Sequence, residues 1–361
     1  MPVTARLVAS PAPRDEWRRL LAEDPDALTF HDPRWTDAIV DAGGGEDASR
    51  LCDVGGRSVV VPLIRRRRGP VELLASLPFG WGFGGAVPGR ALDGEAGPAL
   101  LAALGRRAGI QLTVRPNPLV ADAWSAAAGP SVRRVARRAH VLDLAGGFEA
   151  VWSRRFQGPV RTAVRKAERS GVEVEVDRTG ALVREFYELY ERSILRWSAS
   201  GPLPPAIARR RAAAREPLRK YQAAARDLGD AFEVWVARVG GRPAAAIVVL
   251  AAAGAASYWR GAMDEALAGP VRANQLLHRL AIEAACNRGA RAYHMGETGT
   301  SATLADFKER LGAVPITYSE VRIERVPLTE ARQLGERAAA ASLGLARRAR
   351  ALDVGRRVGH D

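Results

Sequence analysis

The sequence predicts an α/β protein of two tandem domains, each with a mixed central sheet flanked by helices, followed by a basic C-terminal helix. The length of 361 residues is too great for one ordinary core and fits two compact domains. An apolar fraction of 47% and a charged fraction of 26% are typical of globular chains. A helix followed by a hairpin also occurs twice in the same order. The predicted ranges are 1–145 and 146–325 for the domains and 326–361 for the basic helix.

The duplicated pattern begins with "FHDPRWTDAIVDAGG" at 30–44 and "DVGGRSVVVPLI" at 53–64. Its second copy is "FYELYERSILRWSASG" at 186–201 and "RVGGRPAAAIVV" at 238–249. In both copies a "VGGR" turn separates two apolar runs, and glycine supplies the positive φ that a tight hairpin turn requires. The repetition of helix and hairpin therefore predicts two copies of one α/β unit.

The remaining elements follow from periodicity and turn residues. One helix carries Val160, Val164 and Ala167 on a single face and ends at Gly171, and the next strand, "VEVEV", alternates with period two. The other expected segments are a strand running from 71 into a glycine-rich loop that ends at 89, helices at 96–108, 180–198 and 272–288, and strands at 110–116, 292–297 and 316–326.

The formal net charge of +14 predicts a negatively charged partner: a phosphorylated substrate, RNA or an anionic membrane surface. Part of this charge reflects arginine-rich composition, since the chain has only three lysines, Lys166, Lys220 and Lys308. Two isolated cysteines exclude a cysteine metal cluster and a disulfide framework, and no metal site is predicted. No long uncharged apolar run or signal peptide is visible, so we expect a cytoplasmic protein.

One of the rare lysines lies in "TSATLADFKERLGA" at 300–313. Leu304, Phe307 and Leu311 recur at helical spacing and predict a buried face, and Thr303 with Asp306 resembles a capping box. Lys308 is then expected at the edge of this face, where its stem crosses apolar surface and its ammonium reaches a cleft. The alternative is a solvated lysine on an amphipathic helix.

Other candidates follow from their places in the predicted elements. Glu297 ends a strand and is the leading candidate for deprotonating or orienting an amine, because an ammonium has no lone pair with which to attack. His294 and His278 are expected to be structural. Candidates for lining the pocket are Tyr258 and Arg260 on one strand, Arg196 and Trp197 at a helix end, and Trp81 in the glycine-rich loop. For each, ordinary packing or ion pairing is the alternative.

Six motifs in order resemble the FemAB/FemX-like branch of the GNAT acyltransferases, which includes BioF2-like domains. They are "RTAVRKAERSGVEVEV", "FYELYERSILRW", "VARVGGRPAAAIVVL", "YWRGAMD", "ANQLLHRLAIEAACNRGARAYHMGE" and "LADFKERLGA", and the likeness covers about residues 25–325. The resemblance implies two GNAT-like domains facing a cleft. It also implies transfer of an aminoacyl group from aminoacyl-tRNA to an amine of a cell-envelope (peptidoglycan), polysaccharide or related metabolite.

The resemblance further implies site roles. Phe307 and Lys308 match a Phe-Lys site motif, in which Lys308 would hold a substrate phosphate or stabilise an oxyanion. Asn274 would be a polar site residue, and Arg165, in a basic helical cluster, would contact a tRNA acceptor stem or a lipid-linked pyrophosphate. A second basic cluster comprises Arg209, Arg210, Arg211 and Arg215, and solvated helix faces are the alternative for both clusters.

The donor remains open at this point. "LAGPVRANQLLHR" at 267–279 lacks the spaced glycines of the turn that holds the pyrophosphate in many CoA-dependent GNAT enzymes. This favours aminoacyl-tRNA as donor, with acyl-CoA as the alternative, and no tightly bound cofactor. The expected acceptor is an anionic small molecule or a lipid-linked compound, with peripheral contact to an anionic membrane as a further partner. The third alternative is a non-catalytic GNAT-like protein that binds RNA or membrane.

Overall fold

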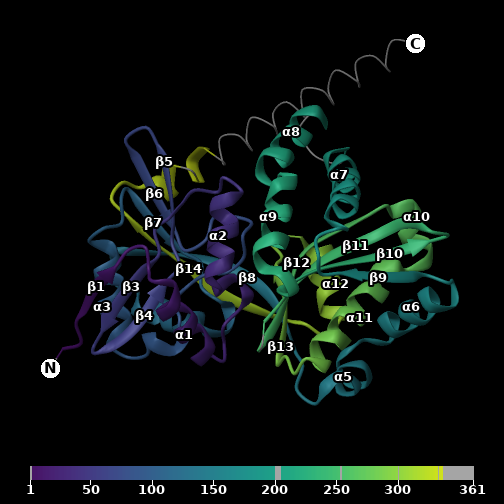
Figure 1. Ribbon diagram of the computed structural model, residues 1–361, viewed down its shortest axis with the longest axis horizontal. Coiled ribbons are helices and arrows are strands. Elements are labelled where there is room, and N and C mark those ends of the chain that lie inside the picture. The colour runs from purple at the N-terminus through teal and green to yellow at the C-terminus, as the bar shows by residue number, and fades with distance from the viewer. Residues whose placement is uncertain (1, 200–204, 253, 300, 332, 336–361) are drawn as a thin grey trace, which may run out of the picture.

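The computed structural model describes residues 2–199, 205–252, 254–299, 301–331 and 333–335. They form one mixed sheet of 11 strands, in the order β2-β5-β6-β7-β14-β8-β13-β12-β11-β10-β9, and a separate sheet in the order β1-β3-β4. Figure 1 shows the first part of the chain on one side and the second on the other, with helices around both. Of the basic helix predicted at 326–361, residues 328–331 and 333–335 are helical. Most of the rest of this range lies outside the described residues.

The first part of the chain supplies one end of the large sheet and the whole of the small one. Its strands are β1 (Ala5–Ala9), β2 (Glu46–Asp47), β3 (Arg50–Val54), β4 (Arg57–Val61), β5 (Ile64–Arg68), β6 (Val71–Ala75) and β7 (Gln111–Val114). Its helices are α1 (Arg14–Glu23), α2 (Pro33–Asp41), α3 (Ala96–Gly105) and α4 (Ala121–Ala127), with short 3-10 turns η1 (Thr29–His31), η2 (Gly89–Leu92) and η3 (Pro118–Val120).

The second part supplies the other end of the sheet. Its strands are β8 (Val132–Asp143), β9 (Glu173–Asp177), β10 (Phe232–Val239), β11 (Arg242–Ala251), β12 (Ala255–Met263), β13 (Ala292–Glu297) and β14 (Val314–Glu324). Its helices are α5 (Gly147–Ala150), η4 (Val151–Arg155), α6 (Gly158–Arg169), α7 (Val183–Ala199), α8 (Pro205–Arg215), α9 (Leu218–Leu228), η5 (Gly229–Ala231), α10 (Glu265–Val271), α11 (Ala273–Asn287) and α12 (Ala302–Arg310).

The local predictions agree with these elements. Both "VGGR" segments are hairpin turns in which both glycines have positive φ, 59° and 83° at Gly55 and Gly56 and 55° and 73° at Gly240 and Gly241. Such consecutive left-handed residues match the twist of the two strands that they join. Helix α6 buries the predicted face and is followed by Gly171 at φ 67°. These features depend on near neighbours in the chain and were therefore readable from sequence.

The sequence predicted one central sheet for each domain, whereas in the structure strands from both parts of the chain join in one continuous sheet. Strand β14 pairs antiparallel with β8 from Val314↔Val141 to Ile323↔Val132, and with β7 on its other side. Strand β8, which was not predicted, reads "VRRVARRAHVLD" and has no apolar pattern of its own in its first half. The boundaries at 145 and 325 stay a prediction, although β14 lies between strands from the predicted first domain.

Helices cover the second part of the sheet on both faces. One face carries α6 and α11, which pack against alternate residues of β10 and β11 such as Trp235 and Ile247. The other face carries α7 and α9, together with α2 from the first part of the chain. Trp35 on α2 contacts Trp259 on β12 with ring centroids 4.9 Å apart. The two parts therefore share a core, which fixes the walls of any site between them.

Candidate active site between the two parts of the chain

A cavity opens where two parallel strands separate. Strands β12 and β13 pair only from Ala255↔Ala292 to Ser257↔His294. Beyond this point their residues line a cavity of about 530 Å³, which the loop at 79–83 closes from the first part of the chain. Ligand sites in α/β folds commonly lie at the carboxyl ends of such strands. The cavity is therefore the leading candidate for an active site.

Lys308 is buried at the wall of this cavity, with only 1% of its surface exposed. Its Nζ donates hydrogen bonds to the carbonyl oxygens of Gly296 and Glu297, at 3.1 and 3.0 Å, and to Oγ1 of Thr298 at 3.2 Å. Gly296 has φ 70°, a left-handed conformation that bends the end of β13. Burial lowers the pKa of Lys308 to about 7, against the opposing charge of Glu297. Lys308 is thus more enclosed than an edge position would make it.

The local helix prediction around Lys308 needs two corrections. Ser301, not Thr303, caps α12, and its side chain accepts from the amide of Leu304. Leu304 is exposed at the cavity, whereas Ala305, Lys308 and Leu311 are buried. The helix begins earlier than predicted and is turned so that the lysine stem, rather than Leu304, enters the interior. Side-chain spacing alone could not determine this rotation, because it depends on packing against β13 and β14.

Glu297 ends β13 and lines the cavity, as its sequence position predicted. Its Oε1 accepts a 2.5 Å hydrogen bond from the Tyr318 hydroxyl and lies 3.6 Å from Nε of Arg115. Arg115 also donates to the buried Glu320, at 2.7 Å. Burial raises the pKa of Tyr318, and the adjacent Glu297 charge raises it further. The Glu297 carboxylate is therefore held in place by a cation and a hydroxyl.

A second charged cluster reaches the cavity through Glu216 and Arg260, and of its members only Arg260 was predicted from sequence. Glu216 Oε1 accepts a 2.6 Å hydrogen bond from Arg260, and its Oε2 accepts one of 2.7 Å from Lys220. Lys220 and Arg260 also donate to the carbonyl of Gly80, at 2.8 and 3.2 Å. Burial lowers the pKa of Lys220 to about 7, and Arg260 acts in the same direction. Lys220 was one of three lysines in the chain, and this rarity was the available signal.

Of the predicted pocket residues, Tyr258, Arg260 and Trp197 line the cavity together with Lys308 and Glu297. Tyr258 is enclosed, and burial raises its pKa to about 12. Trp197 is 52% exposed and contacts Tyr190 edge to face, with the ring centroids 6.2 Å apart. Residues that line the cavity but were not predicted include Phe79, Arg115, Arg137 and Glu216, whereas Arg215 comes from the second predicted basic cluster.

The other predicted site residues do not line this cavity. Trp81 is 4% exposed in the aromatic core, under Nζ of Lys220 at 4.6 Å. Phe307 packs against His278, 5.2 Å between ring centroids, and Arg196 donates to the carbonyl of Met263. Asn274 is half-buried on α11, and Arg165 is exposed on α6 beside Trp152. Aromatic and arginine side chains serve packing as readily as binding, which sequence position alone does not distinguish.

The turn before α11 has no phosphate cradle of the glycine-rich kind. Residues of this segment form α10, and Arg272, at φ 63°, alone separates it from α11. Arg272 is the only non-glycine residue with positive φ among the described parts of the chain. A helix thus occupies the place of a loop whose amides would converge on a pyrophosphate. This agrees with the missing spaced glycines.

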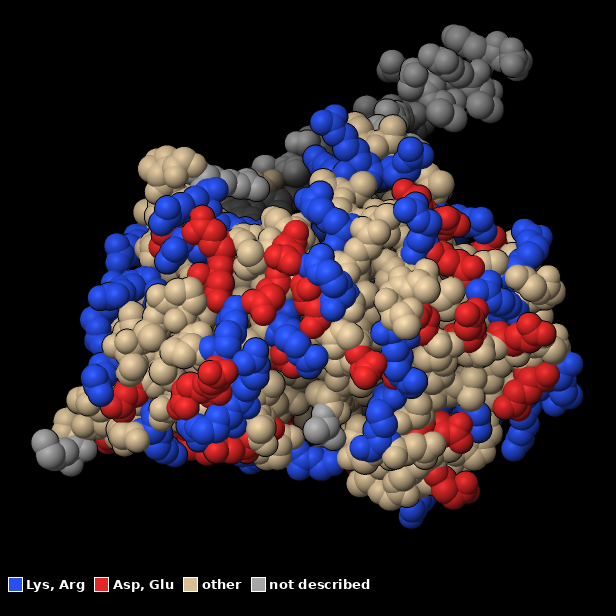
Figure 2. Space-filling view, viewed as in Figure 1, with Lys and Arg blue, Asp and Glu red and all other residues tan. Residues whose placement is uncertain are grey.

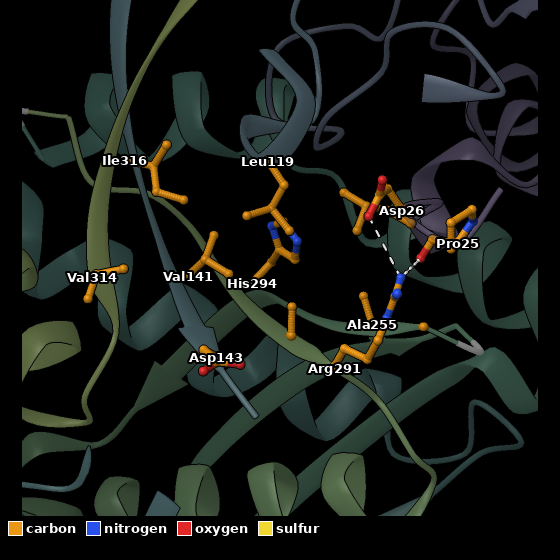
Figure 3. A pocket seen from close by; sticks show the side chains of 13 residues that line it. Pro25, Asp26, Leu119, Val141, Asp143, Ala255, Arg291, His294, Val314 and Ile316 are labelled. Carbon is orange, nitrogen blue, oxygen red and sulfur yellow. Dashed lines mark hydrogen bonds and ion pairs between the residues drawn. The ribbon is translucent and has the colours of Figure 1, made fainter. Parts of the chain in front are cut away.

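A second cavity, of about 300 Å³, shares His294 with the first. Figure 3 shows the His294 ring near Leu119 and Val141, with Arg291 reaching toward Pro25 and Asp26 at the other side. Neither ring nitrogen of His294 has a hydrogen-bond partner in the described structure, and burial lowers its pKa to about 3. His278 is buried in the same manner, so both histidines are neutral, as a packing role requires.

Two classes of site are not found in the described residues. No group of three or more His, Cys, Asp or Glu side chains there is placed to hold a metal ion. Within the same residues, no helix has both the length and the apolar character needed to cross a bilayer.

Comparison with known proteins shows what the second part of the chain resembles. Residues 154–309 match the family described as acetyltransferase (GNAT) domain, and this part of the chain contains the diverging strands and Lys308. Residues 154–309 therefore resemble a GNAT acetyltransferase domain, and the fold of the chain is similar to that of FemX. Comparison with curated protein sequences gives no match.

Solved structures show the same fold over nearly the whole chain. FemX has a TM-score of 0.63 and 14% identity, covering 87% of this chain and 96% of its own. A protein of unknown function from Bacteroides thetaiotaomicron VPI-5482 has a TM-score of 0.55 and 9% identity, covering 87% and 99%. L-PGS from Bacillus licheniformis has a TM-score of 0.52 and 13% identity, covering 91% and 97%. The mixed α/β fold with helices around a large sheet is thus shared with these structures.

Proposed function

We propose that the protein transfers an aminoacyl group from aminoacyl-tRNA to the amine of an anionic acceptor, without a metal. The observation that carries this proposal is the buried ammonium of Lys308 at the wall of the cavity between β12 and β13 of the GNAT domain. Attack of an amine on an acyl ester places negative charge on the carbonyl oxygen. A fixed cation in a site with little water stabilises that charge by several kcal/mol, at the upper end about 4 kcal/mol.

The two groups that the reaction needs face the same cavity. Lys308 stabilises the oxyanion through its charge, and its three hydrogen bonds hold the ammonium where that charge develops. Glu297 accepts a hydrogen bond from the incoming amine and takes its proton as the amide C–N bond forms. The ester C–O bond to tRNA then breaks, and the departing tRNA hydroxyl receives that proton. The hydrogen bond from Tyr318 and the nearby Arg115 keep this carboxylate in place.

The charge of the cavity favours anionic substrates. Its lining includes the cations of Arg115, Arg137, Arg215, Arg260 and Lys308 but only two carboxylates, Glu216 and Glu297. Both carboxylates are paired with arginine. Phosphate on the donor or on a lipid-linked or soluble acceptor therefore meets a net positive surface. An envelope or polysaccharide precursor with a free amine has this chemistry.

Helix α8 favours tRNA as the donor. Arg209, Arg210, Arg211 and Arg215 are exposed on it, and no ion pair involves them within the described residues. Figure 2 shows basic side chains gathered over this helix, and Arg215 at its end lines the cavity. This row of cations leads phosphates toward the site. The basic cluster on α6 has no such connection.

An acyl-CoA-dependent N-acyltransferase is the second candidate. The match of residues 154–309 to an acetyltransferase (GNAT) domain favours it, and α10 in place of the phosphate-binding turn opposes it. The test is to incubate the purified protein with radiolabelled aminoacyl-tRNA or with acetyl-CoA, each with an extract of envelope metabolites. Label moving from tRNA to a small molecule supports the proposal, whereas transfer from acetyl-CoA alone supports the second candidate.

A substitution on α8 tests the donor assignment. The triple variant Arg209→Ala, Arg210→Ala, Arg211→Ala should weaken tRNA binding at least about tenfold at low salt. It should also reduce the slope of log affinity against log salt by about 2, because each lost phosphate contact removes about 0.7–0.9 from the slope. Filter binding over a range of salt concentrations measures both quantities.

The matched control changes the same number of cations on α6: Arg165→Ala, Lys166→Ala and Arg169→Ala. We expect tRNA affinity and salt slope to stay unchanged, since no residue of this helix lines the cavity. An equal loss in both triple variants would mean that tRNA binding depends on overall charge and not on α8.

A further inference from the structure

Three side chains connect Lys308 to the protein surface. Its Nζ lies 3.2 Å from Oγ1 of Thr298, and that oxygen lies 2.7 Å from Nδ1 of His140. Nε2 of His140 lies 3.2 Å from Oε1 of Glu309. Lys308, His140 and Thr298 are buried, whereas the Glu309 side chain is 43% exposed. This series of hydrogen-bonded side chains therefore runs from the wall of the cavity to solvent.

The carboxylate at the outer end fixes the direction of every hydrogen bond. Ionised Glu309 only accepts, so neutral His140 carries its proton on Nε2 and donates it there. Nδ1 of His140 is then an acceptor and takes the hydroxyl proton of Thr298. The Thr298 oxygen is left with lone pairs, and these face Nζ of Lys308. The hydroxyl is thereby oriented to stabilise an ammonium rather than a neutral amine.

The remaining groups around Nζ act in opposite directions. Glu297 on β13 favours the charged form of Lys308, whereas burial and the charge of Arg138 on β8 oppose it. His278 on α11 and His140 on β8 both face Lys308, and burial lowers the pKa of each, so neither adds positive charge at neutral pH. The charge of Glu297 and the hydrogen-bond acceptors around Nζ therefore hold the proton on this lysine. Among the described residues, two of these acceptors are backbone carbonyls, and Thr298 is the only one supplied by a side chain.

We propose that Thr298 and His140, anchored by Glu309, are positioning residues that keep Lys308 charged and thereby set the upper pH limit of the reaction. This proposal rests on the proposed function of Lys308 as the cation that stabilises the oxyanion. Transfer then proceeds while the ammonium is protonated and stops as it loses its proton. No other residue of the cavity has to change position for this effect, because the hydrogen-bonded series acts on Lys308 only through the Thr298 hydroxyl, which faces Nζ.

The first test removes the hydroxyl with an isosteric change. In Thr298→Val, the descending limb of kcat against pH should move down by at least about one pH unit. A hydrogen bond to a charged group contributes about 1.5–3 kcal/mol, and a pKa change of one unit corresponds to about 1.4 kcal/mol. Thr298→Ser should restore the wild-type limb. The control is Asp306→Asn. Asp306 lies on α12, as Lys308 does, but it pairs with Arg310 and takes no part in the hydrogen bonds from Lys308 to Glu309, so this variant should leave the descending limb unchanged. An unmoved limb in Thr298→Val overturns the proposal.

The second test does not depend on activity. The chain contains only the lysines Lys166, Lys220 and Lys308, so NMR of protein labelled with ¹⁵N and ¹³C lysine gives three side-chain signals. Lys308→Met identifies one of them. We expect the Lys308 signal to titrate near pH 7 in the wild type and at least about one unit lower in Thr298→Val and in Glu309→Ala. Identical titration in all three proteins overturns the positioning chain, whatever the assay of transfer shows.

The two tests separate this inference from the proposed function. If neither donor supports transfer but the Lys308 titration shifts as expected, the positioning role of Thr298 and His140 is correct and the reaction proposed for the protein is wrong. If transfer occurs and neither the limb nor the titration moves, the reaction stands and the positioning role is wrong.

Discussion

Replacing Lys308 with Met should lower kcat by a factor of about 10²–10³ with a much smaller change in stability. The factor follows from loss of one fixed group that stabilises the oxyanion. The unfolding effect is smaller because Met fills the same space and removes a buried charge, which offsets the cost of leaving three acceptors without a donor. Steady-state kinetics at saturating donor and a urea titration measure the two effects. Full turnover in Lys308→Met would show that this site is assigned wrongly.

The same residue determines the expected pH dependence. Burial lowers the pKa of Lys308 to about 7, so the ammonium is present below that pH and is lost above it. Transfer that requires the charge should therefore decline as pH rises through about 7, and a neutral lysine acting as a base would give the opposite trend. The matched control is Lys166→Met, which changes an exposed lysine on α6 and should leave both the rate and its pH profile unaltered.

Glu216→Ala should destabilise the protein by about 3–5 kcal/mol. Glu216 is 3% exposed and is the carboxylate partner of both Lys220 and Arg260. Removing one member of a buried ionic cluster leaves the others charged and unpaired, which accounts for the size of the effect. Burial alone would raise the pKa of Glu216, but the charges of Arg260 and Lys220 outweigh it and lower the pKa. Urea unfolding at neutral pH measures the free energy of unfolding.

Two further variants make this result specific. Glu188→Ala removes an exposed carboxylate from neighbouring α7 and should change stability by less than about 0.5 kcal/mol. Lys220→Met should cost less than Glu216→Ala, since Arg260 still neutralises Glu216. Equal effects of Glu216→Ala and Glu188→Ala would mean that the cluster does not hold the loop at Gly80 against the second part of the chain.

Several residues of the candidate site could be predicted from the sequence one by one. Lys308, Glu297, Tyr258, Arg260 and Trp197 were all selected from sequence and line one cavity. Glu297 ends β13, and Trp197 and Lys308 lie in the last turns of their helices, whereas Tyr258 and Arg260 lie within β12. The periodicity and turn residues of these elements are clear, so the places of these residues in the chain were readable. The roles proposed for them remain predictions that the variants above test.

The missed residues share a physical reason. Arg115 and Arg137 belong to β7's end and β8, and they meet only because β14 inserts between these two strands. Glu216 and Lys220 have a visible i, i+4 spacing, yet their partner at Gly80 is 140 residues from Lys220. Trp81 was predicted to line the pocket because an aromatic residue in a glycine-rich loop suits substrate binding as well as it suits packing in the core. Contacts between distant segments decide each of these cases.

By itself, the sequence determined the hairpins, the amphipathic helices and several polar residues that line the cavity. These depend on neighbouring residues through glycine conformation and side-chain periodicity. Only the tertiary structure decided that the two sheets join through β8 and β14, that Lys308 is buried with three acceptors, and that Glu216 neutralises two cations. Burial and charge pairing depend on which segments pack together. The chemical state of Lys308 is therefore a property of the folded protein and not of its local sequence.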